Sequence, residues 1–261
     1  MATGEAQGKP GVAAAVLIRT LESPSEMEAC VELQRLAWGF HDLDLVPRRI
    51  FVVARKIGGQ MLGAWEGERL VGFSMALPGH RPGQTFWHSH MLAVAASHRN
   101  QGVGRRLKLK QREAALEQGI EVIEWTFDPL EILNGHFNLT ILGAIARRYH
   151  PNLYGLTSST LQAGLPTDRL TAEWWLRSPR VVAAAAGEKL PASEIIGEVA
   201  VPAEIQEWKN AQQPEAASTQ AHLRKALCAA FASGTAAVGY RRDSAGGAFL
   251  LGPWIPDEPL P

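Results

Sequence analysis

Residues 88–107 read HSHMLAVAASHRNQGVGRRL, and this stretch decides the fold that the sequence predicts. The apolar run that ends at Val94 is typical of a strand, and Gly102-Val103-Gly104 opens a helix that we expect over Gly102–Gln118, closed by Gly119. Glycines let a backbone approach a ligand closely, and the first turn of a helix leaves N–H groups unpaired at the positive end of its dipole. The stretch therefore predicts a cradle for a pyrophosphate group.

A plainer interpretation of the same residues is a tight glycine turn followed by a solvated basic helix face. A dinucleotide-binding fingerprint is excluded because it needs a third glycine where Leu107 stands. A P-loop is excluded because no Gly-Lys-Ser/Thr triplet follows. The local positive charge comes from six residues: Arg99, Arg105, Arg106, Lys108, Lys110 and Arg112.

Strands and helices alternate on both sides of this stretch, which indicates one α/β unit around a mixed sheet. The apolar patterns predict strands at Ala14–Thr20, Gln60–Trp65, Arg69–Leu77, Phe86–Val94, Ile120–Phe127 and Ala144–Tyr149. They predict helices at Ser25–Trp38, with Ser23 or Ser25 as N-cap, and at Pro129–Leu142, with Asp128 as N-cap. Pro47–Arg55 fits either a helix or a strand, and Pro78–Gly83 is expected to be a loop.

The chain divides into three parts by composition. Residues 1–11 are expected to form a flexible tail, 12–165 the α/β domain, and 166–261 a C-terminal extension or subdomain. In the extension, Val181–Gly187 is interpreted as part of a linker, Thr219–Phe231 as a helix, and the two apolar runs around Asp243–Gly247 as a hairpin.

The bulk composition excludes several classes of protein. The 261 residues carry 26 Lys+Arg and 26 Asp+Glu, so the net charge of zero argues against a nucleic-acid partner bound by bulk charge. Two cysteines make neither a disulfide framework nor a zinc pattern. No apolar run is long enough to span a membrane and no export signal is visible, so we expect a cytoplasmic protein without a membrane partner.

The spacing Arg99-x-Gln101-Gly102-x-Gly104 after a strand resembles the acetyl-CoA-binding motif of the GNAT superfamily of N-acetyltransferases. The resemblance implies an α/β (α+β) fold with a mixed, mostly antiparallel central sheet flanked by helices, to which this chain adds a C-terminal α/β extension. It implies acetyl-CoA as co-substrate, with two central strands that splay to admit the thioester. The residues it assigns to the co-substrate are Leu92, Ala93, Val94, Arg99, Gln101, Gly102, Val103, Gly104 and Arg105, with Asn134 and Asn138 as further contacts on the next helix.

His88 and His90 stand at i and i+2 on a strand, so both are expected to project from one face, on the side of Leu92 and Val94. A histidine suits proton transfer near neutral pH, and an amine must lose a proton before it attacks a thioester. The segment is similar to the one that carries a catalytic histidine pair in arylalkylamine N-acetyltransferases, which implies base and water-relay roles. Two alternatives stay open: a pair of structural histidines, or two ligands of a zinc ion whose third ligand is not apparent.

One part of the family pattern is missing. Family members carry a tyrosine near the end of the helix that corresponds to Pro129–Leu142, as acid for the departing thiolate. Leu139 occupies that place here. We expect Tyr149, or alternatively Tyr154, to substitute for it, unless the thiolate leaves without an acid.

The acceptor is expected to be a small-molecule or peptide amine. The loop Trp38–Asp44 offers Asp42 and Asp44 to a cationic amine, although a solvated acidic loop explains it equally. The sequence thus predicts an acetyl-CoA-dependent N-acetyltransferase that acts by direct attack in a ternary complex, without a metal. The alternatives are a non-catalytic acyl-CoA-binding module, an acyltransferase with a longer acyl donor, or a metal-dependent hydrolase built on the histidine pair. The C-terminal hairpin is a candidate for pairing in a homodimer.

Overall fold

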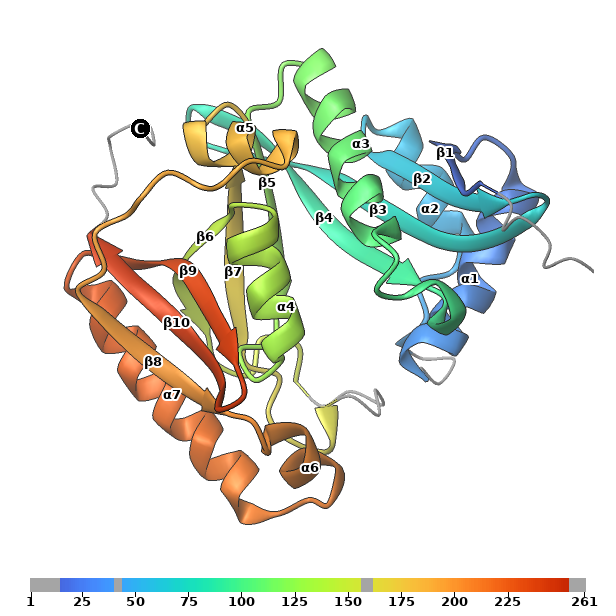
Figure 1. Cartoon of the computed structure of the whole chain (residues 1–261). Helices are drawn as coiled ribbons and strands as arrows, with labels where there is room; N and C mark the ends of the chain where they lie inside the picture. Colours follow the sequence, from blue (N-terminus) through green and yellow to red (C-terminus); the bar gives the residue numbers. More distant parts are fainter. Residues whose placement is uncertain (1–14, 40–43, 156–161, 254–261) are drawn as a thin grey trace, which may run out of the picture.

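The computed structural model describes residues 15–39, 44–155 and 162–253. They form one ten-stranded sheet in the order β1-β2-β3-β4-β5-β7-β6-β9-β10-β8, flanked by helices (Figure 1). This is the α/β architecture with a largely antiparallel sheet that the sequence predicts, and β4–β5 is its parallel pair. The expected tail over residues 1–11 lies outside the described residues.

The strands are β1 (Leu17–Thr20), β2 (Gln60–Glu66), β3 (Arg69–Arg81), β4 (Gln84–Val94), β5 (Val122–Phe127), β6 (Ile145–His150), β7 (Arg169–Trp175), β8 (Gly197–Pro202), β9 (Thr235–Asp243) and β10 (Gly246–Pro253). The loop expected over Pro78–Gly83 is wrong, because β3 continues to Arg81 and pairs with β4 as far as Gln84. Pro78 is tolerated in this strand because the pairing of β2 with β3 ends at Ala76, so one side of β3 is an edge from there on.

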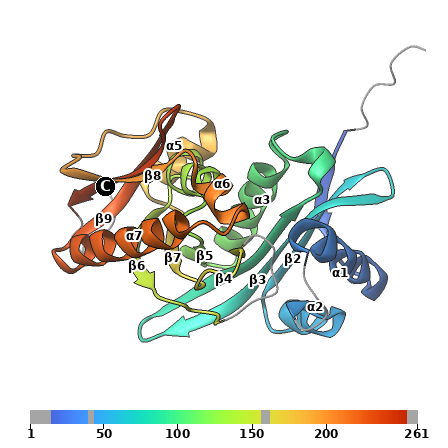
Figure 2. The same ribbon diagram turned by 90° about the horizontal axis from the view of Figure 1, so that it is seen from below.

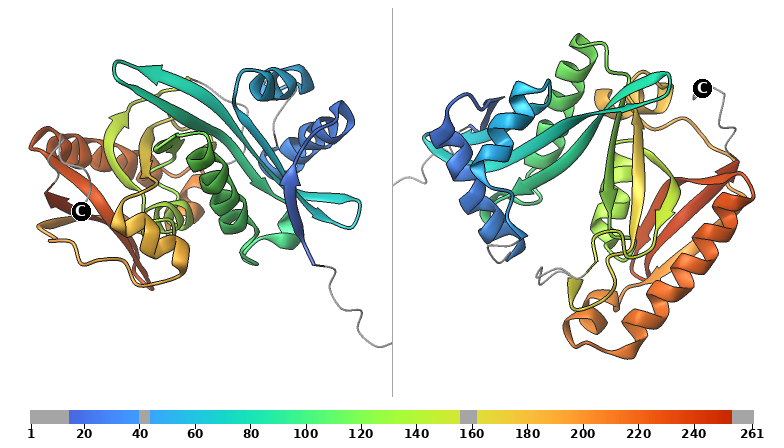
Figure 3. Two further views of the ribbon diagram at one scale, coloured as in Figure 1. Left: turned by 90° about the horizontal axis from the view of Figure 1, so that it is seen from above. Right: turned by 180° about the vertical axis from the view of Figure 1, so that it is seen from behind.

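The helices of the first part are α1 (Pro24–Trp38), α2 (Arg48–Lys56), α3 (Val103–Glu117) and α4 (Ile132–His136). Helix α1 begins at a capping box in which Ser23 and Glu26 each bind the other's backbone N–H. Helices α1 and α2 cover one face of β2–β4, and α3 covers the opposite face (Figures 2 and 3). The ambiguous segment around residue 50 is therefore helical.

The helix expected over Pro129–Leu142 is shorter and less regular than predicted. Asp128 does not cap it directly, because its carboxylate accepts the N–H of Leu130 at 2.8 Å and holds a turn before α4 begins at Ile132. From Phe137 to Ile141 the chain forms a π-helix. Such wide turns are frequent at functional sites.

The C-terminal part extends the same sheet through a contact between β6 and β9. It contains α5 (Pro179–Ala186), α6 (Ile205–Asn210) and α7 (Pro214–Ala232). Helix α7 packs against β6, β8 and β9, and α4 packs against β9 and β10. The boundary expected at residue 165 falls just before β7, a strand that lies inside the sheet between β5 and β6.

The linker expected at Val181–Gly187 is wrong because those residues belong to α5. Val181 is fully buried, and the buried guanidinium of Arg180 donates to the carbonyl oxygens of Gly143 and Val238. These bonds attach α5 to the domain core. Within the described ranges, no helix is long and apolar enough to cross a membrane.

Candidate active site

Strands β4 and β5 diverge along their length (Figure 1), and residues of both strands line a cavity of about 450 Å³. The two strands pair only through Trp87 with Ile123 and His88 with Glu124. Past this point β4 pairs with β3 alone, so its other backbone edge borders the cavity. The lining residues come from β4, α3, β5, α4 and two loops: Trp38, Asp44, Val46, Ser89, His90, Met91, Leu92, Lys108, Trp125, Thr126, Phe127, Asp128, Glu131, Asn134, Phe137, Asn138, Tyr154, Gln162, Thr167 and Arg169.

A β-bulge at His90 sets the side-chain directions in β4. Met75 of β3 pairs with Met91, but the next residue, Ala76, pairs with Ser89, so His90 is an extra residue on β4. The expected placement of both histidines on the face of Leu92 is therefore wrong. The bulge shifts the alternation, so Ser89 shares the α3-facing side with Leu92, and His88 lies on the other side.

The two imidazoles differ in their relation to the cavity. His90 lines it and His88 does not, although their ring centroids are only 6.0 Å apart. Burial lowers the pKa of His90 below its ordinary value. Burial, with repulsion from His90 and from cations nearby, lowers the pKa of His88 to about 4. Both rings are therefore neutral at pH 7, and His90 is the one placed to accept a proton from a group in the cavity.

The glycine turn lies at the cavity mouth. Gly102 has a φ of 78°, which only glycine adopts without strain, and it places the amides of Val103, Gly104 and Arg105 in the first turn of α3. A methyl group on Gly104 would lie 3.6 Å from Leu92 and 3.9 Å from Phe137, two residues that line the cavity. The site thus provides unpaired helix N–H groups beside a narrow groove, which fits a diphosphate with a slender arm.

The long side chains of the turn bind the protein's own backbone. Arg99 donates to the carbonyl of Val94 at 3.2 Å, and Gln101 donates to that of Ser97 at 2.8 Å. Arg105 donates to the last carbonyls of α5, at 2.7 Å to Ala184 and 3.1 Å to Ala185. These bonds occupy the long side chains of the turn, so the main-chain amides of the first turn of α3 are the groups left for a ligand.

The helix after β5 contributes two of the residues that the sequence singles out. Asn134 and Asn138 both line the cavity. Asn138 is buried, and its side-chain oxygen accepts the indole N–H of Trp125 at 3.2 Å. The side chain of Ala93 is buried, so any contact of this residue with a ligand is through its backbone.

The two tyrosines considered as acids lie in different places. Tyr149 does not line the cavity; its hydroxyl donates to Asp168 at 2.6 Å, and Asp168 also binds Arg224 of α7. Burial and Asp168 raise the pKa of Tyr149 far above its ordinary value. Tyr154 lines the cavity, with its hydroxyl 2.8 Å from that of Thr126. The place of Leu139 on the π-helix is fully buried.

Lys108 is a cavity residue that the sequence reasoning missed by assigning it to a solvated basic face. It is only 2% exposed, and its Nζ donates to Ser89 Oγ at 2.8 Å and to Gln111 Oε1 at 3.2 Å. The Nζ also lies 3.5 Å from the ring centroid of Trp125. The sequence does indicate this position, because Lys108 lies four residues after Gly104 and residues i and i+4 share one face of a helix.

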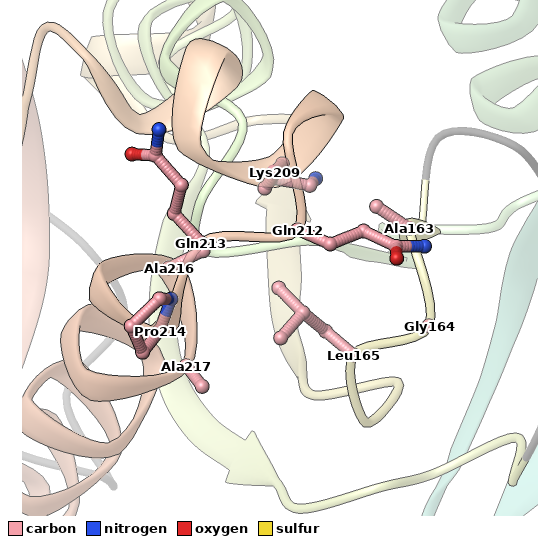
Figure 4. Close-up of a pocket in the computed structure, with 9 residues that line it drawn as sticks. All are labelled: Ala163, Gly164, Leu165, Lys209, Gln212, Gln213, Pro214, Ala216 and Ala217. Carbon is pink, nitrogen blue, oxygen red and sulfur yellow. The ribbon is translucent and has the colours of Figure 1, made fainter.

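Carboxylates occupy the wall of the cavity below α4. Asp44, Asp128 and Glu131 line it, whereas Asp42 lies outside the described residues. Lys209 of α6 reaches this wall and binds Asp128 at 3.1 Å and Glu131 at 2.6 Å. The same lysine lines a second cavity of about 330 Å³ between the 163–165 turn and the start of α7 (Figure 4).

A metal site is not apparent among the residues that the structure describes, since they contain no cluster of three His, Cys, Asp or Glu side chains suited to hold an ion. The zinc interpretation of the histidines therefore has no third ligand in that part of the chain.

Comparison with known proteins agrees with this geometry. Residues 27–131 match the family model of the acetyltransferase (GNAT) family. No curated protein matches the sequence significantly.

Three solved structures share the fold at low identity. The yncA protein of Salmonella typhimurium, assigned as an acetyltransferase and solved with its cofactor acetyl-CoA, is 15% identical, with a TM-score of 0.50 over 62% of this chain and 94% of its own. A GNAT-family acetyltransferase of Streptococcus pneumoniae is 17% identical, with a TM-score of 0.50 over 61% and 98%. A GNAT-family protein of Desulfovibrio desulfuricans is 14% identical, with a TM-score of 0.50 over 62% and 99%.

Proposed function

We propose that this protein transfers an acetyl group from acetyl-CoA to an amine, because residues 27–131 match the family model of the GNAT acetyltransferases. The reaction is direct attack of the amine on the thioester while both substrates are bound. The observation that carries the proposal is the continuity between the first turn of α3 and the cavity between β4 and β5, which meet at Leu92 and Phe137.

The donor half of the site is assigned to the mouth and the free edge of β4. The amides of residues 101–105 hold the diphosphate, and the backbone of Leu92–Val94 binds the pantetheine arm. Asn134 and Asn138 contact the arm from α4. The bound thioester supplies an activated acetyl carbon, and these residues orient it toward the point where the two strands converge.

The acceptor half is assigned to the side of His90. This imidazole is neutral at pH 7 because burial lowers its pKa, so it can take a proton from an incoming ammonium group. His88 does not line the cavity, and its role is to hold the neighbouring ring and a water molecule in place. The carboxylate of Asp44 on the cavity wall favours a cationic acceptor, either a small amine or a peptide amine.

The experiment is an assay for CoA thiol released from acetyl-CoA, run on the purified chain with polyamines, arylalkylamines, aminoglycosides and peptides as acceptors. We expect release that depends on one class of amine and acetylated product of matching mass. Release that is independent of every amine would contradict the amine acceptor. Release that is saturable only with a longer acyl-CoA would contradict the acetyl donor.

A second candidate function is supported by Leu139, which replaces the tyrosine of the family pattern. The chain is then an acyl-CoA-binding module without turnover. The thiol assay and a thermal melt together separate the two functions. For a binding module, acetyl-CoA raises the melting temperature of the protein, but no thiol is released with any amine.

A further inference from the structure

The cavity contains a buried amine that the proposed function does not use. Lys108 lies on α3, one turn beyond Gly104 and on the same helix face. Its Nζ is hydrogen-bonded to Ser89 and Gln111 and lies over the ring of Trp125. Ser89 and Gln111 are themselves buried, so this amine is held in one position rather than free to reach solvent.

The amine lies beside the point where β4 and β5 stop pairing. Ser89 directly follows His88, the last β4 residue that pairs with β5. It precedes Val94, at the mouth, by five residues, which is about 16 Å of strand. An arm that enters beside Gly104 and follows β4 therefore brings its far end to the Nζ of Lys108.

Lys108 is buried without a negatively charged partner among the described residues. Within residues 15–39, 44–155 and 162–253, no carboxylate lies within ion-pair distance of its Nζ. A buried ammonium without a counter-ion is costly, and burial lowers the pKa of Lys108 well below its ordinary value. His88 is the nearby titratable group that would repel the ammonium if both were charged, but its pKa of about 4 leaves it neutral at pH 7. The amine consequently gains from any anion that forms beside it.

We propose that Lys108 carries a proton from the attacking amine to the departing sulfur, in the place of the tyrosine that Leu139 replaces. This inference rests on the proposed function. In the step, a bond forms between the acceptor nitrogen and the acetyl carbon, and the carbon–sulfur bond breaks. The acceptor has already given one proton of its ammonium form to His90; as its nitrogen bonds to the carbon it loses a second proton to the neutral Nζ of Lys108, the resulting ammonium pairs with the thiolate, and that proton then passes to sulfur. Lys108 returns to a neutral amine and nothing else is consumed.

Trp125 and Ser89 stabilise the ammonium form of Lys108 during this step. The aromatic face attracts an ammonium, and the hydroxyl of Ser89 accepts one of its N–H groups. Gln111 accepts a second N–H, which leaves the third for the sulfur. Tyr154 lies on the opposite wall with its hydroxyl bound to Thr126, so it is not required as the acid.

The test compares the binding of CoA and of desulfo-CoA, which lacks only the thiol, to the wild type, to Lys108→Met and to Lys110→Met. Lys110 is an exposed lysine of the same helix that binds Glu113, and it serves as the matched control. We expect CoA to bind about tenfold or more tightly than desulfo-CoA in the wild type and in the control, because a charge-assisted contact contributes that much. In Lys108→Met the two ligands should bind equally.

Thiolate absorption of bound CoA in the ultraviolet gives a second readout, present in the wild type and absent in Lys108→Met. An unchanged preference for CoA in Lys108→Met, with the variant folded by circular dichroism, overturns the inference and leaves the proposed function standing. Failure of the wild type to bind CoA at all contradicts the proposed function itself. An acetyl group found on Lys108 by mass spectrometry after incubation with acetyl-CoA alone also overturns the inference, because an amide nitrogen is not basic and cannot accept the proton.

Discussion

Two buried lysines with nearly the same exposure have opposite electrostatic surroundings. Lys108 in the β4–β5 cavity is 2% exposed and Lys209 on α6 is 1% exposed. Although burial alone would lower the pKa of Lys209, Asp128 and Glu131 raise it above its ordinary value. Lys108 has neutral partners, and burial lowers its pKa. The comparison separates a cation that holds two segments together from an amine that is available for proton transfer.

The difference follows from what each lysine connects. Lys209 joins the C-terminal extension to the turn between β5 and α4, and Gln206 adds a bond to Glu131 at 2.9 Å. Lys108 joins α3 to the neighbouring strand β4, but only through the neutral groups of Ser89 and Gln111. A buried titratable side chain without a charged partner is a functional candidate.

The largest expected effect is on stability, in Lys209→Met. Removal of one partner of a buried ion pair leaves two carboxylates uncompensated, so we expect the free energy of unfolding to fall by about 3 kcal/mol. Urea denaturation monitored by tryptophan fluorescence measures it. The double variant Lys209→Met, Glu131→Gln is the control and should recover part of the loss. Unchanged stability in the single variant would contradict the structural role assigned to Lys209.

The next effect concerns access of the donor to Lys108. Gly104→Val places a branched side chain against Leu92 and Phe137, and we expect the affinity for CoA to fall by about a hundredfold, which corresponds to about 2.7 kcal/mol. Gly104→Ala is the matched control and should bind CoA as the wild type does, because the methyl group meets only ordinary contact distances. Isothermal titration calorimetry provides the measurement. Equal binding in both variants would mean that the arm does not pass Gly104.

The two histidines of β4 sharpen the comparison, because only His90 lines the cavity that contains Lys108. Loss of a base in the cavity should lower kcat in His90→Gln by about a hundredfold. His88→Gln should lower kcat by less than about tenfold, because His88 does not line the cavity. Steady-state rates with the best amine of the panel test this, and CoA affinity should stay constant in both. Equal losses in the two variants would contradict the separation that the bulge produces.

A smaller effect, of opposite sign to that of Lys209→Met, is expected on the stability of Lys108→Met. Methionine matches the length of the side chain and removes a poorly solvated amine, but it leaves the hydroxyl of Ser89 without its partner. We therefore expect the free energy of unfolding at pH 7 to be unchanged or higher by about 1 kcal/mol. Urea denaturation under the same conditions checks it. A loss as large as that of Lys209→Met would make Lys108 a structural lysine.

A separate effect, confined to acid pH, is the pH dependence that His88 gives to stability. Its pKa is about 4 in the folded protein and about 6.5 when unfolded. Above pH 6.5 both states are neutral and nothing changes. As pH falls from 6.5 to 4 the unfolded state binds a proton that the folded state does not, so stability declines. Thermal unfolding across this range should show a shallower decline in His88→Gln, and parallel curves would exclude this cause.

The sequence predicts the mouth of the site better than its interior. The glycine turn and the strand before it are local features, and their residues lie where the pattern places them. The bulge at His90 cannot be read from β4 alone, because it is defined by which β3 residues it faces. The burial of Lys108 likewise depends on the packing of α3 against β4 and β5, which are distant in sequence. Its spacing from Gly104 nevertheless indicates the correct helix face.

The same reasoning explains the errors in the fold. Val181 and its neighbours have the composition of a linker, yet they form α5 because Arg180 finds carbonyl partners in distant segments. Strand β7 escapes notice because Glu173 interrupts its apolar pattern, and this buried carboxylate is paired with Arg147 and Arg148 of β6. In each case a long-range contact stabilises a residue that the local pattern disfavours.

The most direct test of the account is a crystal structure of the protein with CoA. The account predicts that the diphosphate accepts hydrogen bonds from the amides in the first turn of α3, that the arm lies along β4 from Val94 to Ser89, and that the sulfur lies within hydrogen-bond distance of the Nζ of Lys108. A CoA molecule whose diphosphate binds another element, or whose sulfur lies outside the β4–β5 cavity, would contradict it.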